Sequence, residues 1–187
     1  SSAASDVYKR QIPERLITPH SFFTSINNNN YYGVISGPCH AEEIALEKQS
    51  YLTISSESST HVEYLKSIFK SNFLQVTISS DVVGAEYAAI IKNIYAILTG
   101  VCSGLGYGDN FLAVLITAAA NELHNLLMIM DSKNRIITKA AYLGDLLVTC
   151  YSAHSRNRSL GFSIGKGLSL SKAISQTKMV AEGYHAC

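Results

Sequence analysis

The 187-residue sequence has few of the groups that would support metal or nucleic-acid binding. Its four cysteines, Cys39, Cys102, Cys150 and Cys187, are far apart and form no CxxC pair. Zinc sites usually draw on paired ligands close in sequence, so we expect no metal site, and free thiols indicate a reducing, cytoplasmic compartment. Only 16% of the residues are charged, the formal net charge is +1, and no block of Lys and Arg exists. Nothing therefore predicts a nucleic-acid partner.

Targeting and membrane-spanning segments are also not expected. The N-terminus shows no cationic region followed by an apolar run, so it does not resemble a secretory signal. The two most apolar stretches, residues 87–98 and 111–130, contain Lys92 and Glu122. A bilayer span tolerates few such groups, and we interpret both stretches as core helices.

The glycine-rich turn typical of dinucleotide-binding domains is missing as well. A GxGxG pattern at residues 104–108 follows an apolar helical stretch instead of a strand. We interpret it as a connection between two helices, because the GxGxxG turn needs a strand before it and a crossover helix after it. Residues 1–11 are polar and rich in Ser and Ala, and we expect them to be foreign or disordered sequence.

The remaining chain divides into an α/β part and a helical part. Three short runs rich in β-branched and aromatic residues predict strands at 31–36, 51–55 and 74–79. Helical patterns at 40–49 and 59–72 lie between them, and this alternation predicts parallel pairing. Three strands are too few for a complete doubly wound domain, so residues 12–80 are predicted to be a partial dinucleotide-binding domain.

Residues 81–187 show only helical patterns. Long helices are predicted at 84–99 and 110–130, joined by a turn at 100–110. Shorter helices are predicted near 136–142, 145–151, 155–165 and 169–177. We therefore expect an all-α domain with its boundary near residue 81.

The first candidate for chemistry is Lys92, which lies in the middle of an apolar helical pattern. Its neighbours at three and four residues are Ala88, Ala89, Tyr95 and Ala96. Three small neighbours predict room for a ligand to approach the ammonium group. The alternative is a lysine whose stem covers apolar surface while its charge reaches water.

The second candidate is the stretch 143–157. Asp145 lies at a predicted helix start, and Thr149 follows on the same helical face. The alternative is that Asp145 only caps the helix and Thr149 bonds back to it. Ser155, Arg156 and Asn157 lie at the next helix start, where unpaired amides and a guanidinium suit a phosphate. A solvated Arg156 is the alternative there.

The third candidate is the turn at residues 36–41, Ser-Gly-Pro-Cys-His-Ala, between a strand and a helix. In open α/β sheets ligands gather at the carboxyl ends of strands, although such a turn also occurs without function. The six histidines show no HxxxH or HExxH spacing. We expect them to be surface or core residues.

Four motifs in order give the chain a family resemblance: residues 36–46 (SGPCHAEEIAL), 84–110 (GAEYAAIIKNIYAILTGVCSGLGYGDN), 143–161 (LGDLLVTCYSAHSRNRSLG) and 180–186 (VAEGYHA). They resemble the bacterial-type NAD(P)-dependent glycerol-3-phosphate dehydrogenases from about residue 12 to the end. The resemblance implies an α/β remnant of a Rossmann-like domain followed by an all-α substrate domain of the 6-phosphogluconate dehydrogenase C-terminal-like class.

The implied activity is interconversion of dihydroxyacetone phosphate and sn-glycerol 3-phosphate with NAD or NADP, feeding glycerophospholipid synthesis. The expected partner is therefore a small phosphate ester, and a homodimer is compatible with the resemblance. Lys92 resembles the proton donor and acceptor, and Asp145 the acid beside it. The positions that match substrate-binding residues are Gly37, Cys39, Lys92, Asn93, Asp145, Thr149, Ser155, Arg156 and Asn157. The positions that match cofactor-binding residues are Ala41, Arg156, Val180 and Glu182.

Two departures from the family pattern matter. The GxGxxG start is missing, together with the early strands of the cofactor cleft. A second active-site lysine is expected before residue 36, but Lys9 lies in the doubtful segment 1–11, and Arg10 stands where a glycine is usual. We therefore expect a fragment truncated at both ends, with little turnover of its own. A related dehydrogenase of a 2-hydroxy acid and a catalytically inactive helical packing module are the alternatives.

Overall fold

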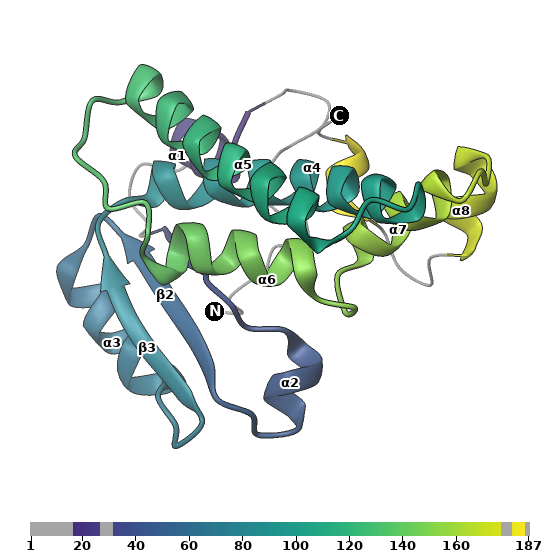
Figure 1. Cartoon of the computed structure of the whole chain (residues 1–187). Helices are drawn as coiled ribbons and strands as arrows, with labels where there is room; N and C mark the ends of the chain where they lie inside the picture. Colours follow the sequence, from purple (N-terminus) through teal and green to yellow (C-terminus); the bar gives the residue numbers. More distant parts are fainter. Residues whose placement is uncertain (1–16, 27–31, 177–180, 186–187) are drawn as a thin grey trace.

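A computed structural model describes residues 17–26, 32–176 and 181–185 (Figure 1). A small sheet lies against a layer of helices, so the predicted α/β-then-helical class is confirmed. The elements before residue 81 are α1 (Pro19–Ile26), β1 (Gly33–Ser36), α2 (Ala41–Ala45), β2 (Ser50–Ser56), α3 (Ser59–Phe69) and β3 (Leu74–Ser79). After it come α4 (Val82–Gly104), α5 (Asp109–Met130), the π-helix η1 (Ala140–Gly144), α6 (Asp145–Tyr151), α7 (Arg156–Gly165), α8 (Leu170–Gln176) and the 3-10 helix η2 (Glu182–His185).

The three strands lie in the order β1-β2-β3, but only one pair is parallel. β2 and β3 are parallel, with Ser50 opposite Leu74, and α3 between them packs on both strands. β1 and β2 are antiparallel, with Ser36 opposite Thr53, so the prediction of parallel pairing was wrong for this pair. The five-residue α2 lies near the start of β2 and not across the sheet (Figure 1), so the chain turns back instead of crossing over.

The long helix α4 is the centre of the helical layer and packs against α5, α6 and α7. Alanines on α4 allow these helices to approach closely. Ala88 lies in a core cluster with Leu123 and Leu127 of α5. About two helical turns further along α4, Ala96 packs with Ile116 of α5 and Leu146 of α6. The core that supports the site is therefore formed around one helix.

The predicted turn at 100–110 was wrong in its first half, because α4 continues to Gly104. The glycines that suggested a turn serve a contact between helices instead. A Cβ atom on Gly100 would lie 2.1 Å from the carbonyl oxygen of Arg158 on α7. Glycine is therefore needed there for backbone approach, and the turn itself is confined to residues 105–108.

α6, α7 and α8 form at the predicted places, but the helix predicted near 136–142 does not. An irregular segment and the π-helix η1 replace it. Arg135 explains the irregular path, because its guanidinium donates to both carboxylate oxygens of Asp81 at 2.6 and 2.9 Å and to the carbonyl oxygen of Asp131 at 2.8 Å. Tyr142 also donates to Asp81. This buried network holds the segment against the start of α4.

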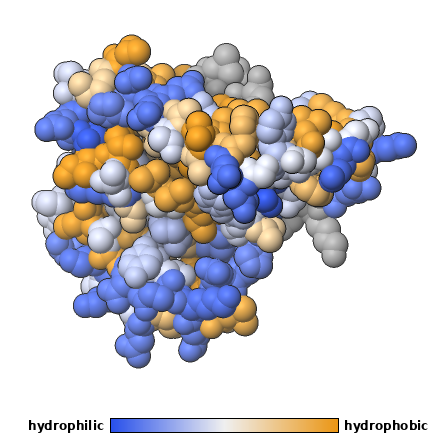
Figure 2. Space-filling model, in the orientation of Figure 1, coloured by the Kyte–Doolittle hydropathy of each residue, from blue (hydrophilic) through white to orange (hydrophobic). Residues whose placement is uncertain are grey.

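α4 and α5 are long and apolar enough to cross a membrane by length and composition. α4 lies within the helical layer, as predicted for a core helix. α5 buries only one face, and Val114 and Ile129 on its other face are exposed. Figure 2 shows apolar side chains mixed with polar ones along this layer.

Candidate active site

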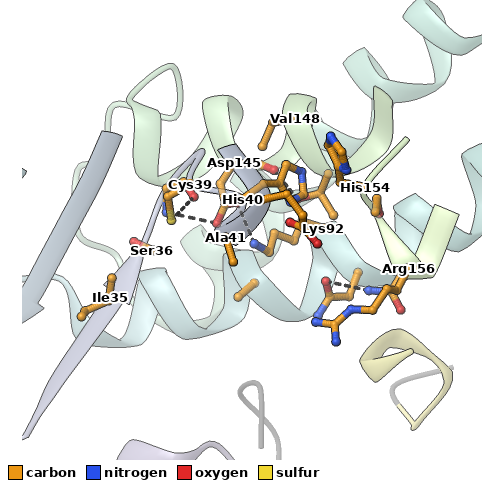
Figure 3. A pocket seen from close by; sticks show the side chains of 17 residues that line it. Ile35, Ser36, Cys39, His40, Ala41, Lys92, Asp145, Val148, His154 and Arg156 are labelled. Atoms are coloured by element: carbon orange, nitrogen blue, oxygen red, sulfur yellow. Dashed lines mark hydrogen bonds and ion pairs between the residues drawn. The ribbon is translucent and has the colours of Figure 1, made fainter. Parts of the chain in front are cut away.

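A pocket of about 380 Å³ lies where the end of β1 meets α2, α4, α6 and the start of α7 (Figure 3). It gathers most of the predicted site residues from segments far apart in the sequence. Those that line it are Gly37, Cys39, Ala41, Lys92, Asn93, Asp145, Thr149, Ser155, Arg156 and Asn157. The predicted convergence of the ammonium, the carboxylate and the guanidinium on one cavity is therefore present in the structure.

The centre of the pocket is an ion pair between α4 and α6. Nζ of Lys92 donates to Oδ1 of Asp145 at 2.6 Å, and the two side chains are 19% and 5% exposed. Lys92 therefore does not reach out to bulk water, which was the alternative interpretation. The other oxygen of Asp145 accepts a hydrogen bond from the backbone N–H of Gly37 at 3.2 Å. The carboxylate thus holds the lysine and the turn together and does not cap its own helix.

The surroundings of Lys92 differ in part from the expectation. Ala89 lines the pocket, as the prediction of space beside the ammonium requires. Ala88 and Ala96 instead face the core, because α5 and α6 pack against that side of α4. Most of the room in front of the lysine therefore comes from the pocket between elements, and not from small neighbours on its own helix.

Thr149 lies one turn after Asp145, and its hydroxyl donates to the carbonyl oxygen of Asp145 at 2.6 Å. The alternative interpretation of Thr149 as a residue that bonds back to its helix is therefore correct. Its side chain is buried and still borders the pocket. A hydroxyl that donates to the helix keeps its lone pairs available to a ligand.

Gly37 gives the turn after β1 its shape. Its φ is +117°, and a Cβ there would lie 2.6 Å from the carbonyl oxygen of Tyr51. Only glycine fits this position without strain. Cys39 donates from Sγ to the carbonyl oxygen of Gly37 at 3.2 Å. The turn is thus fixed with one N–H directed at Asp145.

Buried amide groups on α4, α7 and η2 form a chain of hydrogen bonds beside the pocket. Asn157 donates from Nδ2 to Oδ1 of Asn93 at 3.0 Å. Its own Oδ1 accepts from the backbone N–H of Gly183 at 2.9 Å. Ser155 caps α7 by accepting from the backbone N–H of Arg158 at 3.3 Å. These bonds place the N-terminal end of α7 at the pocket.

Arg156 is the first residue of α7 and lies at one end of the pocket, on the opposite side from His154 (Figure 3). The exposed Glu42 of α2 is within electrostatic reach of both. The hydrogen bond from its own backbone N–H holds the pKa of Glu42 below its usual range, slight burial opposes this, and His154, His40 and Arg156 lower it further. The carboxylate of Glu42 is therefore stabilised in its charged form by cationic and ionisable groups that line the pocket.

Sequence reasoning missed the two histidines. His40 and His154 were expected to be surface or core residues, but both line the pocket, with ring centroids 5.9 Å apart. The available signal was position, because His40 follows the Ser-Gly-Pro-Cys turn directly and His154 precedes Ser155. The lack of a short His–His spacing concealed the pair, since folding and not sequence brings the rings together.

Two predicted positions cannot be placed in full. Val180 lies outside the described residues, as does the doubtful Lys9, and of Glu182 only the backbone, in η2, is described. Within the described ranges, no group of three His, Cys, Asp or Glu side chains is placed to hold a metal ion.

The family described as the C-terminus of NAD-dependent glycerol-3-phosphate dehydrogenase matches residues 81–187. The chain belongs to this family. Glycerol-3-phosphate dehydrogenase [NAD(P)+] of Clostridium botulinum (strain Eklund 17B / Type B) is 40% identical over 159 residues, which are 85% of this chain and 48% of that protein. A second such dehydrogenase, from Salinibacter ruber, is 42% identical over 151 residues, 81% of this chain and 44% of the relative.

Solved structures of dehydrogenases give the same picture. The crystal structure of glycerol-3-phosphate dehydrogenase from Coxiella burnetii superposes with a TM-score of 0.86 at 31% identity, over 89% of this chain and 51% of that one. The yeast enzyme, with a TM-score of 0.77 and 22% identity, shares the fold. The chain therefore spans about half the length of the dehydrogenases it matches.

Proposed function

We propose that this chain supplies the substrate-binding and proton-transfer half of an NAD(P)-dependent glycerol-3-phosphate dehydrogenase, which interconverts dihydroxyacetone phosphate and sn-glycerol 3-phosphate. The observation that carries the proposal is the Lys92–Asp145 pair, which shares one pocket with Arg156 and the start of α7. We assign the product to glycerophospholipid synthesis and the protein to the cytoplasm. Residues 12–80 belong to the cofactor domain and residues 81–187 to the substrate domain in this proposal.

Lys92 is the proposed acid and base. Reduction of a ketone develops negative charge on the carbonyl oxygen, and an ammonium group held beside that oxygen stabilises the charge and donates its proton. In the oxidation direction the neutral amine takes the proton from the hydroxyl. Asp145, with Oδ1 at 2.6 Å from Nζ, orients the amine.

The phosphate is assigned to the end of the pocket where α7 begins. Unpaired amides at a helix N-terminus and the fork of donors on Arg156 both suit a phosphate. A volume of about 380 Å³ lies within the common range for small-molecule sites, roughly 300–1,000 Å³. Asn93 and Thr149 border the space between Lys92 and this end.

This chain has predicted contacts for only the nicotinamide end of NAD or NADP. Ala41 at the start of α2 and Arg156 border the pocket and would hold the nicotinamide side, with Val180 and Glu182 as further predicted contacts. The bound nicotinamide supplies the hydride acceptor or donor. No GxGxxG turn exists in the sequence to hold the pyrophosphate, so we assign that task to the half of the relatives that this chain does not span.

A chimera tests the proposal. This chain replaces the matching segment of the Clostridium botulinum relative, and oxidation of NADH and NADPH is followed with dihydroxyacetone phosphate. We expect turnover that falls by at least about 10²-fold in Lys92→Ala, while Lys172→Ala, exposed on α8, leaves it unchanged. Turnover only with a 2-keto acid would favour a 2-hydroxy acid dehydrogenase. No turnover with either substrate would favour an inactive packing module.

A further inference from the structure

A line of hydrogen bonds runs from η2 through α7 to α4 and ends next to Lys92. The backbone N–H of Gly183 donates to Oδ1 of Asn157 at 2.9 Å. Nδ2 of Asn157 donates to Oδ1 of Asn93 at 3.0 Å. Asn93 follows Lys92 directly in α4, and both residues line the pocket. We call Gly183, Asn157 and Asn93 the amide relay.

The direction of the amide relay is set at its first bond. A backbone N–H can only donate, so the atom of Asn157 that faces Gly183 has to be the oxygen. The nitrogen of Asn157 then faces Asn93, and a nitrogen that donates needs the oxygen of Asn93 as its acceptor. The orientation of both side-chain amides therefore follows from one backbone group.

Close packing of η2 on α4 holds this backbone group in place. A Cβ atom on Gly183 would lie 2.6 Å from the carbonyl oxygen of Asn93, so only glycine allows the two backbones to approach this closely. Asn157 and Asn93 are 7% and 5% exposed. An unpaired polar atom in such surroundings is costly, and reversal of either amide would leave two like atoms facing each other. The main chain of η2 thus determines what Asn93 presents to the pocket.

The amide relay leaves the N–H groups of Asn93 available to a ligand. Within the ranges that the structure describes, no group accepts a hydrogen bond from Nδ2 of Asn93, and this atom is not closed off as the unpaired atoms of the interior are. The ammonium group of Lys92 points into the same pocket (Figure 3). Two adjacent residues of α4 therefore offer hydrogen-bond donors there. Donors that are fixed in advance stabilise an oxygen on which negative charge develops.

We propose that Asn157 is a positioning residue, which acts through Asn93 by holding its N–H groups toward the reacting oxygen of the substrate. This inference rests on the proposed function, because it takes the ketone of dihydroxyacetone phosphate as the ligand. The family resemblance assigns Asn157 to substrate binding. The amide relay gives it this task in addition, since its oxygen and one of its N–H groups are already bonded within the protein.

A fixed donor makes the site selective for an acceptor. A ketone oxygen only accepts hydrogen bonds, whereas a hydroxyl group can donate or accept. If the amide of Asn93 were reversed, its oxygen would face the ketone oxygen and repel it, but a hydroxyl group could rotate and donate. Binding of the ketone should therefore depend on Asn157 more than binding of the alcohol does.

Calorimetry on the 187-residue chain tests the inference without turnover. Asn157→Asp keeps the shape and the bond from Gly183, but a carboxylate cannot donate, so Asn93 has to reverse its amide to bond with it. We expect the affinity for dihydroxyacetone phosphate to fall about tenfold or more, and that for sn-glycerol 3-phosphate to fall by a factor about three times smaller. The added charge acts on the phosphate of both ligands and therefore cancels in the ratio of the two affinities.

A double-mutant cycle shows whether Asn157 acts through Asn93. In an Asn93→Ala background no amide remains to be reversed, so Asn157→Asp should change the ketone-to-alcohol ratio by less than about twofold. Gly183→Ala should shift the ratio in the same direction as Asn157→Asp, because the added Cβ displaces η2 from α4. Asn125→Asp, at an exposed position of α5 outside the pocket lining, is the matched control and should change neither affinity.

The side-chain amide NMR signals of the unchanged chain give a readout that does not depend on a variant's ability to fold. Addition of dihydroxyacetone phosphate should shift the signals of Asn93 more than those of Asn157; the reverse order would contradict the relay.

Equal losses for the two ligands in Asn157→Asp would overturn the inference, as would a change of the ratio that persists in the Asn93→Ala background. Unchanged affinities, or absence of dihydroxyacetone phosphate binding by the unchanged chain, would overturn it as well. None of these results decides the proposed function, because the chimera's turnover with dihydroxyacetone phosphate is measured separately.

Discussion

Nζ of Lys92 and Oδ1 of Asp145 lie 2.6 Å apart although 53 residues separate them in the sequence. The second carboxylate oxygen reaches the backbone N–H of Gly37, so one side chain joins α4, α6 and the turn after β1. An acid that is 5% exposed and makes these two bonds fixes the lysine in the pocket. Loss of this carboxylate should lower the turnover rate and the free energy of unfolding by different amounts.

Asp145→Asn is the substitution that separates the two effects. The amide keeps an oxygen for Gly37 but loses the charge that orients Lys92. We expect turnover of the chimera to fall by at least about 10²-fold, and the free energy of unfolding to fall by about 1–3 kcal/mol because a largely buried ammonium loses its partner. Initial rates and urea denaturation measure the two quantities.

The matched control is Asp109→Asn, an exposed acid in the first turn of α5. It should change the free energy of unfolding, and the activation free energy calculated from the rate, by no more than about 0.5 kcal/mol each. If Asp145→Asn retained full turnover, the pair would be structural only.

Arg156→Ala addresses the phosphate. The guanidinium at the start of α7 should contribute to substrate binding more than to the proton transfer at Lys92. We expect the KM of the chimera for dihydroxyacetone phosphate to rise at least about tenfold, with a smaller change in kcat. Steady-state kinetics measure both, and Lys172→Ala serves again as the control. An unchanged KM would remove Arg156 from the phosphate site.

The sequence predicted the site better than the sheet. Lys92, Asp145 and Arg156 were candidates from local helical patterns, because caps and apolar periodicity are local properties, and the family resemblance supplied their predicted roles. The orientation of β1 was not predictable in this way, since it depends on whether α2 crosses the sheet. His40 and His154 were missed for a similar reason, because only the folded chain brings their rings to 5.9 Å from each other.

Asp81 gives a prediction on pH dependence. Burial alone would raise the pKa of this carboxyl, but hydrogen bonds from Arg135, Tyr142 and the backbone N–H of Gly84 outweigh it, so the pKa lies below the usual value of 3.8. A carboxyl with a depressed pKa stabilises the fold above its unfolded-state pKa. That contribution is lost as the pH falls below 3.8 and through the folded-state value.

Asp81→Asn should therefore lower the free energy of unfolding by about 2–4 kcal/mol at pH 7, where Arg135 loses one of its two charged partners and keeps Asp131. The difference from the unchanged chain should stay constant down to about pH 5 and shrink below pH 4. Urea denaturation across this range, to the lowest pH at which both proteins remain folded, measures it. A difference that grows on acidification would contradict the assignment.

The contact between α4 and α7 gives the last prediction, because it depends on glycines that lie inside helices. Alanine is the better helix former by about 1 kcal/mol, so local propensity favours Gly100→Ala. The added Cβ would, however, lie 2.1 Å from the carbonyl oxygen of Arg158, and backbone cannot move aside as a flexible side chain can. We expect a net loss of about 2 kcal/mol or more in the free energy of unfolding. Gly108→Ala is the control, since among the described residues no atom beyond its chain neighbours lies within 4 Å of its Cβ position, and it should cost less than about 1 kcal/mol. Gly100→Ala should also raise the KM of the chimera for the phosphate ester, because Ser155, Arg156 and Asn157 lie at the start of α7. A stable variant with an unchanged KM would show that the α4–α7 contact and the site are independent.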